Sequence, residues 1–443
     1  MTAYPKLFAP SIMTNMQLSG KVYSVGGRDD IKPSLGILND REMVLFTCHQ
    51  HLELAAHGGP CGYFHTVMYR SHDGGQTWGQ GKHMPFWGYE PSVSVIDGVL
   101  FVQTHLHPNL FVSNKACMAI LYRSEDQGET WTHQDMDGSM FGYQKPVVTC
   151  MDRNLVKLPD GSIMGLVWVD GTETFRILST DGGRNWQANR VNVKVRHRGN
   201  RSPITEAYSY VTPSGRLLCV SRVNWFLIEE PMPYGIQLEK EFDTDEGDGM
   251  LLLESCDKGL TWEPVRGLGY CGMMYPGVVY LDQNHFLLTY TCRETRVESP
   301  YNHMGVQAVM GCEQENGTID VDFEHDVIII DDRTDDDSVC VGGYGITQRL
   351  SDGTLITPYS YTCDTPQLLQ RYKDGSFQQD DVFFDYCLRS GRYTEKGPDL
   401  EWWRRSSKIW KRVLLNEFAS AVHESCSISQ ILRWHLTRNG EEK

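Results

Sequence analysis

The sequence has 443 residues, 40% of them hydrophobic and 22% charged, so it can bury a sizeable core and is not expected to be disordered over most of its length. Its formal net charge of −16 argues against a protein that binds nucleic acid or anionic membranes, because either would require a basic face. The 42 glycines and 11% aromatic residues favour a turn-rich β protein.

Targeting signals and cofactor motifs are not evident in the sequence. No apolar stretch has the length of a signal peptide or a membrane span, so we expect a cytoplasmic location. The 13 cysteines form no Cys-x-x-Cys pairs and are interpreted as reduced core thiols. We predict neither a metal site nor a cofactor.

Six short β-hairpins recur along the chain. Successive turns lie 54 to 70 residues apart, and each is flanked by strand-like runs. A period of this length, with at least four β runs per unit, is typical of a four-stranded propeller blade. The six turns are Asn39-Asp40, Asp97-Gly98, Asp160-Gly161, Ser214-Gly215, Asp282-Gln283 and Asp352-Gly353.

An octet with the pattern S-x-D-x-G-x-[TN]-W falls after each of the first four hairpins, at residues 71–78, 124–131, 179–186 and 255–262. Its Asp can accept hydrogen bonds from its own turn, its Gly permits positive φ, and its Trp anchors the returning strand. We predict that the octets form the outer hairpins of blades. The fifth and sixth units have plain turns there, at Glu313 to Gly317 and Lys373 to Gly375.

The strand-like pattern ends near Tyr393, and three later segments have helical patterns: 400–405, 409–415 and 428–436. The predicted fold is therefore all-β, a six-bladed propeller of four-stranded antiparallel blades over residues 1–395, followed by a short helical C-terminal tail over 396–443. We expect the tail to pack against the ring, and a helix that binds a partner is the alternative.

Aligning the hairpins on their turns brings one polar residue per blade to the entrance of the innermost strand. Such equivalent positions surround the mouth of a propeller's central channel. These residues are interpreted as a functional ring, and solvent-facing strand ends are the alternative. The six residues are Lys32, Glu90, Arg153, Glu206, Tyr275 and Tyr344.

Further candidates lie at the far ends of the same hairpins. Arg222 follows Glu206 across one hairpin, so the two side chains could flank one site, and Arg293 ends another. A buried arginine near a Tyr and a Glu would bind an acidic ligand. The pairs His49/His51 and His105/His107 make a metal site conceivable but lack a third ligand. The run Asp331 to Asp337 is interpreted as a solvated loop rather than a Ca²⁺ site.

The octets within six β units resemble the Asp-box (BNR) repeats of the sialidase (neuraminidase) superfamily, over about residues 25–390. The resemblance implies a Tyr nucleophile activated by a Glu, arginines that bind a carboxylate, and an Asp as acid and base. It places Glu206 and Arg222 in the family's Glu and Arg hairpin, Arg293 (or Arg296) as the third arginine, and Tyr344 as the nucleophile.

Two features depart from the family pattern. Ile31-Lys32-Pro33 stands where the family has an arginine, so Lys32 or Arg28 would have to replace it. The loop from His49 to His65 contains no Asp and offers His49 and Glu53 as proton donors.

The predicted function is that of an exo-acting, sialidase-like glycoside hydrolase acting on a terminal acidic or polar sugar of a glycan. Tyr344 would be the nucleophile, Glu206 its base, and His49 or Glu53 the proton donor. Arg222, Arg293 and Arg153 would bind the acidic group, and Lys32, Glu90 and Tyr275 would complete the substrate site. A polysaccharide lyase acting on uronates and a non-catalytic propeller that binds glycans or proteins are the alternatives.

Overall fold

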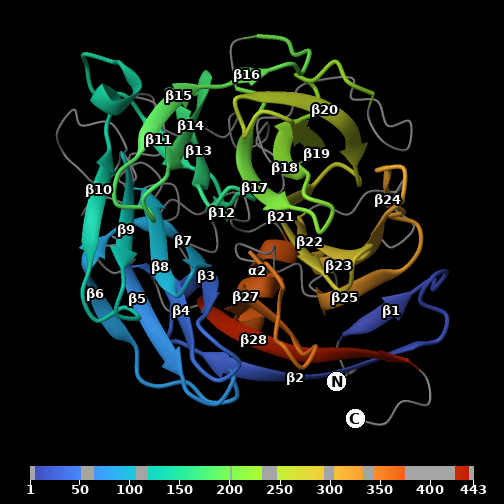
Figure 1. Cartoon of the computed structure of the whole chain (residues 1–443). Helices are drawn as coiled ribbons and strands as arrows, with labels where there is room; N and C mark the ends of the chain where they lie inside the picture. The colour runs from blue at the N-terminus through green and yellow to red at the C-terminus, as the bar shows by residue number, and fades with distance from the viewer. Residues whose placement is uncertain are drawn as a thin grey trace.

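Six antiparallel sheets surround a common centre in the computed structural model (Figure 1). The prediction of a six-bladed propeller of four-stranded antiparallel blades is therefore confirmed, and three of the blades carry further short strands. The structure describes residues 5–50, 64–105, 118–199, 202–231, 247–293, 304–332, 344–374 and 425–438.

Each of the six predicted hairpin turns joins the two innermost strands of a blade. The first three blades follow one another along the chain. The first blade is β3 (Asp30–Ile37), β4 (Met43–Gln50), β5 (Phe64–Ser71) and β6 (Lys82–Trp87). The second is β7 (Tyr89–Ile96), β8 (Val99–His105), β9 (Ala119–Ser124) and β10 (Thr132–Met136). The third is β11 (Thr149–Met151), β12 (Val156–Lys157), β13 (Ile163–Val169), β14 (Glu173–Ser179) and β15 (Gln187–Arg190), with a 3₁₀ turn at Gly138–Phe141 before it.

The fourth and fifth blades each gain extra strands at their outer edges. The fourth blade is β17 (Thr205–Val211), β18 (Leu217–Asn224), β19 (Asp248–Ser255) and β20 (Thr261–Leu268), with β16 (Asn192–Val193) beside β20. The fifth is β21 (Met273–Tyr280), β22 (His285–Cys292), β23 (Gly305–Glu313), β24 (Ile319–Val321) and β25 (Val327–Asp332), with the N-terminal β1 (Lys6–Phe8) beside β25.

The sixth blade closes the ring with strands from both ends of the chain. Its order is β26 (Gln348–Arg349), β27 (Leu355–Asp364), β28 (Ser425–Arg438) and β2 (Met16–Val25). In Figure 1 the red C-terminal strand lies against the blue N-terminal strand. A short helix, α2 (Pro366–Lys373), follows β27, and no described helix is long and apolar enough to cross a membrane.

The prediction of a helix at residues 428–436 is wrong, because this segment lies within strand β28. The side chains of Ser425, Ser427 and Ser429 are buried on one face, and Ile431 is buried further along the strand. Strand β28 pairs along its length with β2 and β27, so the propeller extends to Arg438 rather than ending at 395. The predicted helices at 400–405 and 409–415 lie outside the described residues.

All four octets turn between the third and fourth strands of their blades, as predicted. In the first, Asp73 Oδ1 accepts hydrogen bonds from Thr77 N at 2.9 Å and Gln76 N at 3.0 Å, and Ser71 Oγ accepts one from Gly75 N at 2.8 Å. The octet tryptophans also join blades: Trp131 lies edge-on to Phe46 of the first blade, with ring centroids 6.0 Å apart. The octets therefore stabilise the scaffold.

Candidate active site

Five of the six ring residues have a left-handed backbone, with φ between 47° and 57°. They are Lys32, Glu90, Glu206, Tyr275 and Tyr344. In the first, second, fourth and fifth blades the register between the two inner strands shifts at this residue, which indicates a β-bulge. A left-handed conformation is costly for residues other than glycine and is typical of functional sites.

Side chains of the preceding blade accept hydrogen bonds from the backbone N–H groups of two ring residues. Lys32 N donates to Ser360 Oγ at 3.3 Å, and Tyr344 N donates to Thr291 Oγ1 at 3.2 Å. Arg153, the sixth ring residue, lies between β11 and β12, and its backbone N donates to Ala207 O of the next blade at 2.8 Å. Backbone contacts between blades thus fix three of the six ring positions.

The charged ring residues form a continuous series of ion pairs. The Lys32 ammonium contacts Glu90 and the Tyr89 hydroxyl. Arg153 lies between two carboxylates, 3.5 Å from Glu90 Oε2 and 3.0 Å from Glu206 Oε2. Four blades therefore contribute to one buried network.

Arg222 extends the network into the fourth blade. Its guanidinium lies 3.1 Å from Glu206 Oε2 and donates from Nε to Asp248 Oδ2 at 2.7 Å. The sequence prediction that Glu206 and Arg222 flank one site agrees with this geometry. Asp248 and Tyr89 were missed, although Tyr89 directly precedes ring residue Glu90 and Asp248 begins the strand beside Arg222.

Two tyrosines from neighbouring blades lie in contact above the ion pairs. The rings of Tyr275 and Tyr344 have centroids 4.2 Å apart, and their hydroxyl oxygens are 3.1 Å apart. Tyr344 Oη also lies 3.3 Å from Glu90 Oε1 and accepts a hydrogen bond from Arg293 at 3.4 Å. The carboxylate next to Tyr344 is thus Glu90, whereas Glu206 contacts the two arginines.

Burial and charge shift the protonation of these groups. Burial, with Tyr275 and Glu90 beside it, raises the pKa of Tyr344 well above its usual value, so the phenol is neutral at pH 7. Burial raises the pKa of Glu90 too, but Lys32 and Arg153 lower it overall, so Glu90 is ionised. Burial lowers the pKa of Lys32 to about 8, although Glu90 opposes this shift.

Of the two predicted proton donors, His49 lies within the described residues. His49 Nδ1 lies 2.8 Å from the buried carboxylate of Asp30, and its ring lies near His65, with centroids 5.4 Å apart. Glu53 lies outside the described residues. In the described ranges, no group of three His, Cys, Asp or Glu side chains could hold a metal ion.

Two cavities adjoin the ring residues and share part of their lining, including Arg153 and Tyr344. A cavity of about 20 Å³ lies among Lys32, Glu90, Arg153, Tyr275 and Tyr344, large enough for one water molecule. A larger cavity of about 610 Å³ continues along the inner strands. Its lining includes Leu35, Val95, Leu155, Tyr280 and Arg349.

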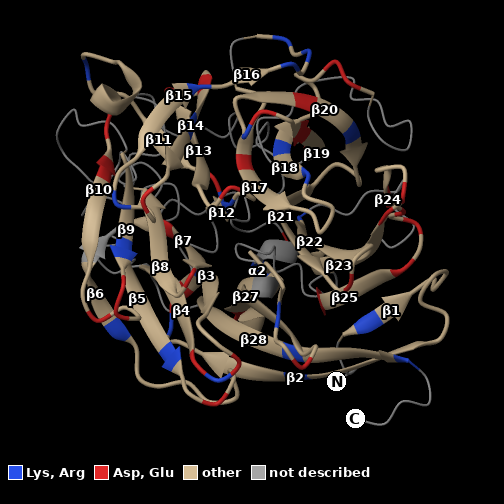
Figure 2. Cartoon of the chain, viewed as in Figure 1, with Lys and Arg blue, Asp and Glu red and all other residues tan. Residues whose placement is uncertain are grey.

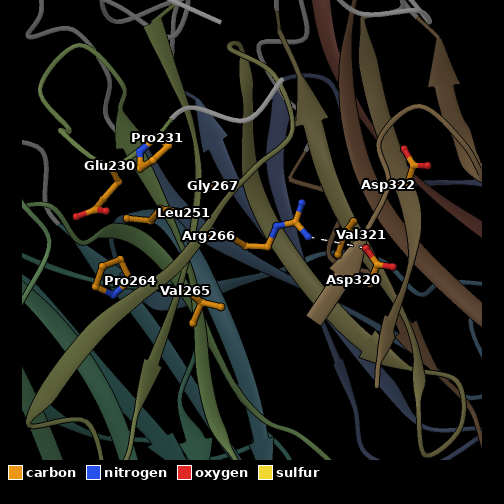
Figure 3. Close-up of a pocket in the computed structure, with 10 residues that line it drawn as sticks. All are labelled: Glu230, Pro231, Leu251, Pro264, Val265, Arg266, Gly267, Asp320, Val321 and Asp322. Carbon is orange, nitrogen blue, oxygen red and sulfur yellow. Dashed lines mark ion pairs between the residues drawn. The ribbon is translucent and has the colours of Figure 1, made fainter. Parts of the chain in front are cut away.

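A third cavity lies away from the ring, on outer strands. Figure 3 shows this groove of about 540 Å³, with Val265 and Arg266 of β20 on one side and Asp320 of β24 on the other. Arg266 lies 3.9 Å from Asp320.

Over the propeller as a whole, acidic and basic residues are interspersed (Figure 2). The converging polar groups therefore single out the channel mouth as the candidate active site.

Fold and site together define a six-bladed propeller with a buried, ion-paired site that includes two tyrosines. Among solved structures, the chain is similar to a protein of unknown function from Dyadobacter fermentans, with a TM-score of 0.54 and 17% identity over 79% of this chain and 95% of that one. It is also similar to the NanB sialidase from Streptococcus pneumoniae, with a TM-score of 0.52 and 12% identity over 76% of this chain and 66% of that one. The chain therefore has a sialidase-like fold. No family model and no curated protein matches it.

Proposed function

We propose that the protein is a glycoside hydrolase that removes a terminal acidic or polar sugar from a glycan. The observation that supports the proposal most directly is the contact of Tyr344 Oη with Glu90 at 3.3 Å, at the channel mouth of a sialidase-like fold. A phenol next to an ionised carboxylate can act as a nucleophile with its own base. Sialidases are glycosidases that use a Tyr nucleophile.

In the first half of the reaction, Tyr344 Oη forms a bond to the anomeric carbon as the bond to the leaving oxygen breaks. Glu90 takes the phenol proton, because it is the carboxylate in contact with Tyr344. It replaces Glu206, the base that the sequence suggested. The leaving oxygen takes its proton from His49, which Asp30 orients, or from Glu53.

In the second half, water attacks the anomeric carbon and gives a proton to the group that acted as acid. The bond to Tyr344 breaks, and Glu90 returns its proton to the phenol. The free sugar is released, and every catalytic group regains its initial protonation state.

The charges of the site bear on the substrate. Four cations, Lys32, Arg153, Arg222 and Arg293, lie around the two tyrosines, together with three carboxylates, Glu90, Glu206 and Asp248. The described set thus has one excess positive charge, which suits a sugar with a single carboxylate or a ring of hydroxyls. Arg293 has the most direct access to the reacting atoms, because it donates to Tyr344 Oη.

The test is hydrolysis of aryl glycosides of sialic acid and of uronic acids by the full chain. We expect Tyr344→Phe and Glu90→Gln each to lower kcat/KM by about 10³-fold, and the double variant to be no worse, because the pair acts as a unit. Glu206→Gln should mainly raise KM, because Glu206 forms ion pairs with Arg153 and Arg222, which are proposed to bind the acidic group. Tyr210→Phe, a buried tyrosine that packs on Tyr280, is the control and should retain activity.

Unchanged hydrolysis in Tyr344→Phe would disprove the assignment of the nucleophile. A product that absorbs in the ultraviolet would indicate elimination, and hence a lyase.

A propeller that binds glycans without cleaving them is the second candidate. Its support is that Lys32, Arg153 and Arg222 are already paired with the protein's own carboxylates. Retention of acidic glycans on an array, with no sugar released over hours, would favour binding alone.

A further inference from the structure

Two cysteines lie directly opposite each other where the ring closes. Cys363 on β27 and Cys426 on β28 are register partners in the antiparallel pair. Both are free thiols and both are partly exposed to solvent. Opposite residues in an antiparallel pair point to the same face of the sheet, so the two thiols share one face.

The backbone spacing at this position suits a disulfide bond. Residues directly opposite in an antiparallel pair have Cα atoms about 4.5–5.5 Å apart, and disulfides span about 4.4–6.8 Å. Cys363 also acts on its partner: burial first and Cys363 second raise the pKa of the Cys426 thiol, while Arg28 opposes the shift.

We propose that Cys363 and Cys426 form a reversible disulfide when the protein meets a thiol oxidant of the glutathione disulfide class. The proposal concerns a modification site and does not depend on the hydrolase activity. The bond would link the C-terminal strand of the sixth blade to the strand that precedes it in the sheet.

The chemistry balances as a thiol–disulfide exchange. One cysteine thiolate attacks a sulfur of glutathione disulfide, and one glutathione thiolate leaves. The second cysteine thiolate then attacks the protein sulfur of this mixed disulfide and releases the second glutathione. Two protein thiols are oxidised, one glutathione disulfide is reduced to two glutathiones, and the reaction quickens as the pH rises, because the thiolate is the nucleophile.

The bond would fix a region that reaches the candidate active site. Ser425 O accepts a hydrogen bond from Arg28 at 2.6 Å, and Ser427 O accepts one from Asp29 N at 2.9 Å. Arg28 and Asp29 lead directly into β3, which presents Lys32. Because the disulfide closes a loop of about 60 residues, we expect it to raise the Tm by about 3–6 °C.

The experiment equilibrates the full chain in glutathione buffers of increasing oxidised fraction. Differential alkylation and peptide mass spectrometry then measure each cysteine. We expect one linked peptide that joins Cys363 to Cys426, together with the rise in Tm, and both should be reversed by dithiothreitol. Cys426→Ser and Cys363→Ser should each abolish both effects, whereas Cys256→Ser, at an exposed cysteine, should leave them unchanged.

The peptide mass spectrum of the chain without substitutions shows whether Cys363 and Cys426 form the disulfide, even if a variant fails to fold. Separate glutathione adducts on Cys363 and Cys426, or two thiols that stay reduced in fully oxidised buffer, would overturn the proposal. An equal rise in Tm in Cys426→Ser would show that the stabilisation has another origin.

Discussion

Asp152 is a carboxyl group that the fold keeps away from water. Its side chain is buried, Oδ1 accepts a hydrogen bond from Ala207 N at 3.1 Å, and Oδ2 has no hydrogen-bond partner among the described residues. Burial raises its pKa to about 7, and Glu206 contributes to the shift while Arg153 opposes it. A folded pKa above the unfolded value means that Asp152 contributes stability at low pH, which is lost as the pH rises through about 7.

We therefore expect Asp152→Asn to be more stable than the unmodified protein at pH 8, by about 2–4 kcal/mol, and to show a smaller loss of stability between pH 5 and 8. An amide oxygen can accept the hydrogen bond from Ala207 N, as Asn154 Oδ1 accepts one from Ser209 N at 2.9 Å. Urea unfolding at both pH values measures the effect. Asp97→Asn, at an exposed site, is the control, and equal pH dependence in all three proteins would refute the prediction.

Lys32 should set the alkaline limit of any hydrolase activity. Its pKa of about 8 means that the ammonium loses its proton as the pH rises through this value, and Glu90 then loses Lys32 as a cationic partner and keeps Arg153. We expect kcat/KM to fall above pH 8. In Lys32→Arg this alkaline limb of the pH profile should move to higher pH, because arginine stays charged. A limb at the same pH in both proteins would assign it to another group.

The six ring residues were predicted from sequence, because each comes seven or eight residues before a recognisable turn. Their side chains lie together for a reason that sequence spacing does not contain: five of them adopt a left-handed backbone. The pairing of Glu90 rather than Glu206 with Tyr344 depends on the distances between blades. Local patterns could not distinguish these two carboxylates.

At the scale of single elements, the octets should behave as independent stabilising turns. Asp73 accepts two backbone hydrogen bonds and one from Thr77 Oγ1 at 2.6 Å, which lowers its pKa to about 2 against the effect of burial. We expect Asp73→Ala to lower the free energy of unfolding by about 1–2 kcal/mol. Asp126→Ala should also lower the free energy of unfolding, because Asp126 accepts the same kind of hydrogen bonds from Thr130.

Urea unfolding at pH 7 tests this prediction. Asp135→Ala, an exposed residue outside the octets, should change stability by less than about 0.5 kcal/mol. A loss at Asp73 no greater than that at Asp135 would show that the turn is held by other contacts.

The hairpins were predictable because Asp-Gly and related turns mark them in the sequence. Strand β28 was not, because its apolar residues Ile428, Ile431, Leu432 and Leu436 follow a helical spacing. Its buried face begins with three serines, which provide no hydrophobic signal. Pairing with β2 and β27 decides the structure, and sequence periodicity does not report that pairing.

For the whole molecule, closure of the ring depends on Trp434. Its side chain is fully buried, and Nε1 donates to Thr357 Oγ1 of β27 at 3.0 Å. We expect Trp434→Ala to lower the free energy of unfolding by about 3–5 kcal/mol, because the substitution leaves a cavity between the fifth and sixth blades. Thr437→Ala near the end of the same strand should cost less than about 1 kcal/mol in the same unfolding assay. Similar losses for the two variants would contradict a central role for Trp434.

The number of blades was predictable from the repeat, but the closure was not. It joins Met16–Val25 to Ser425–Arg438, segments about 400 residues apart whose pairing leaves no local pattern.

Such a closure also determines when the protein can finish folding during its synthesis. The first five blades take most of their strands from consecutive stretches of chain, so they can form as they leave the ribosome. Strand β2 is made about 400 residues before its partner β28. While these residues are being made, β2 lacks this partner and exposes an edge, and a chaperone that covers exposed strands would have its longest opportunity there.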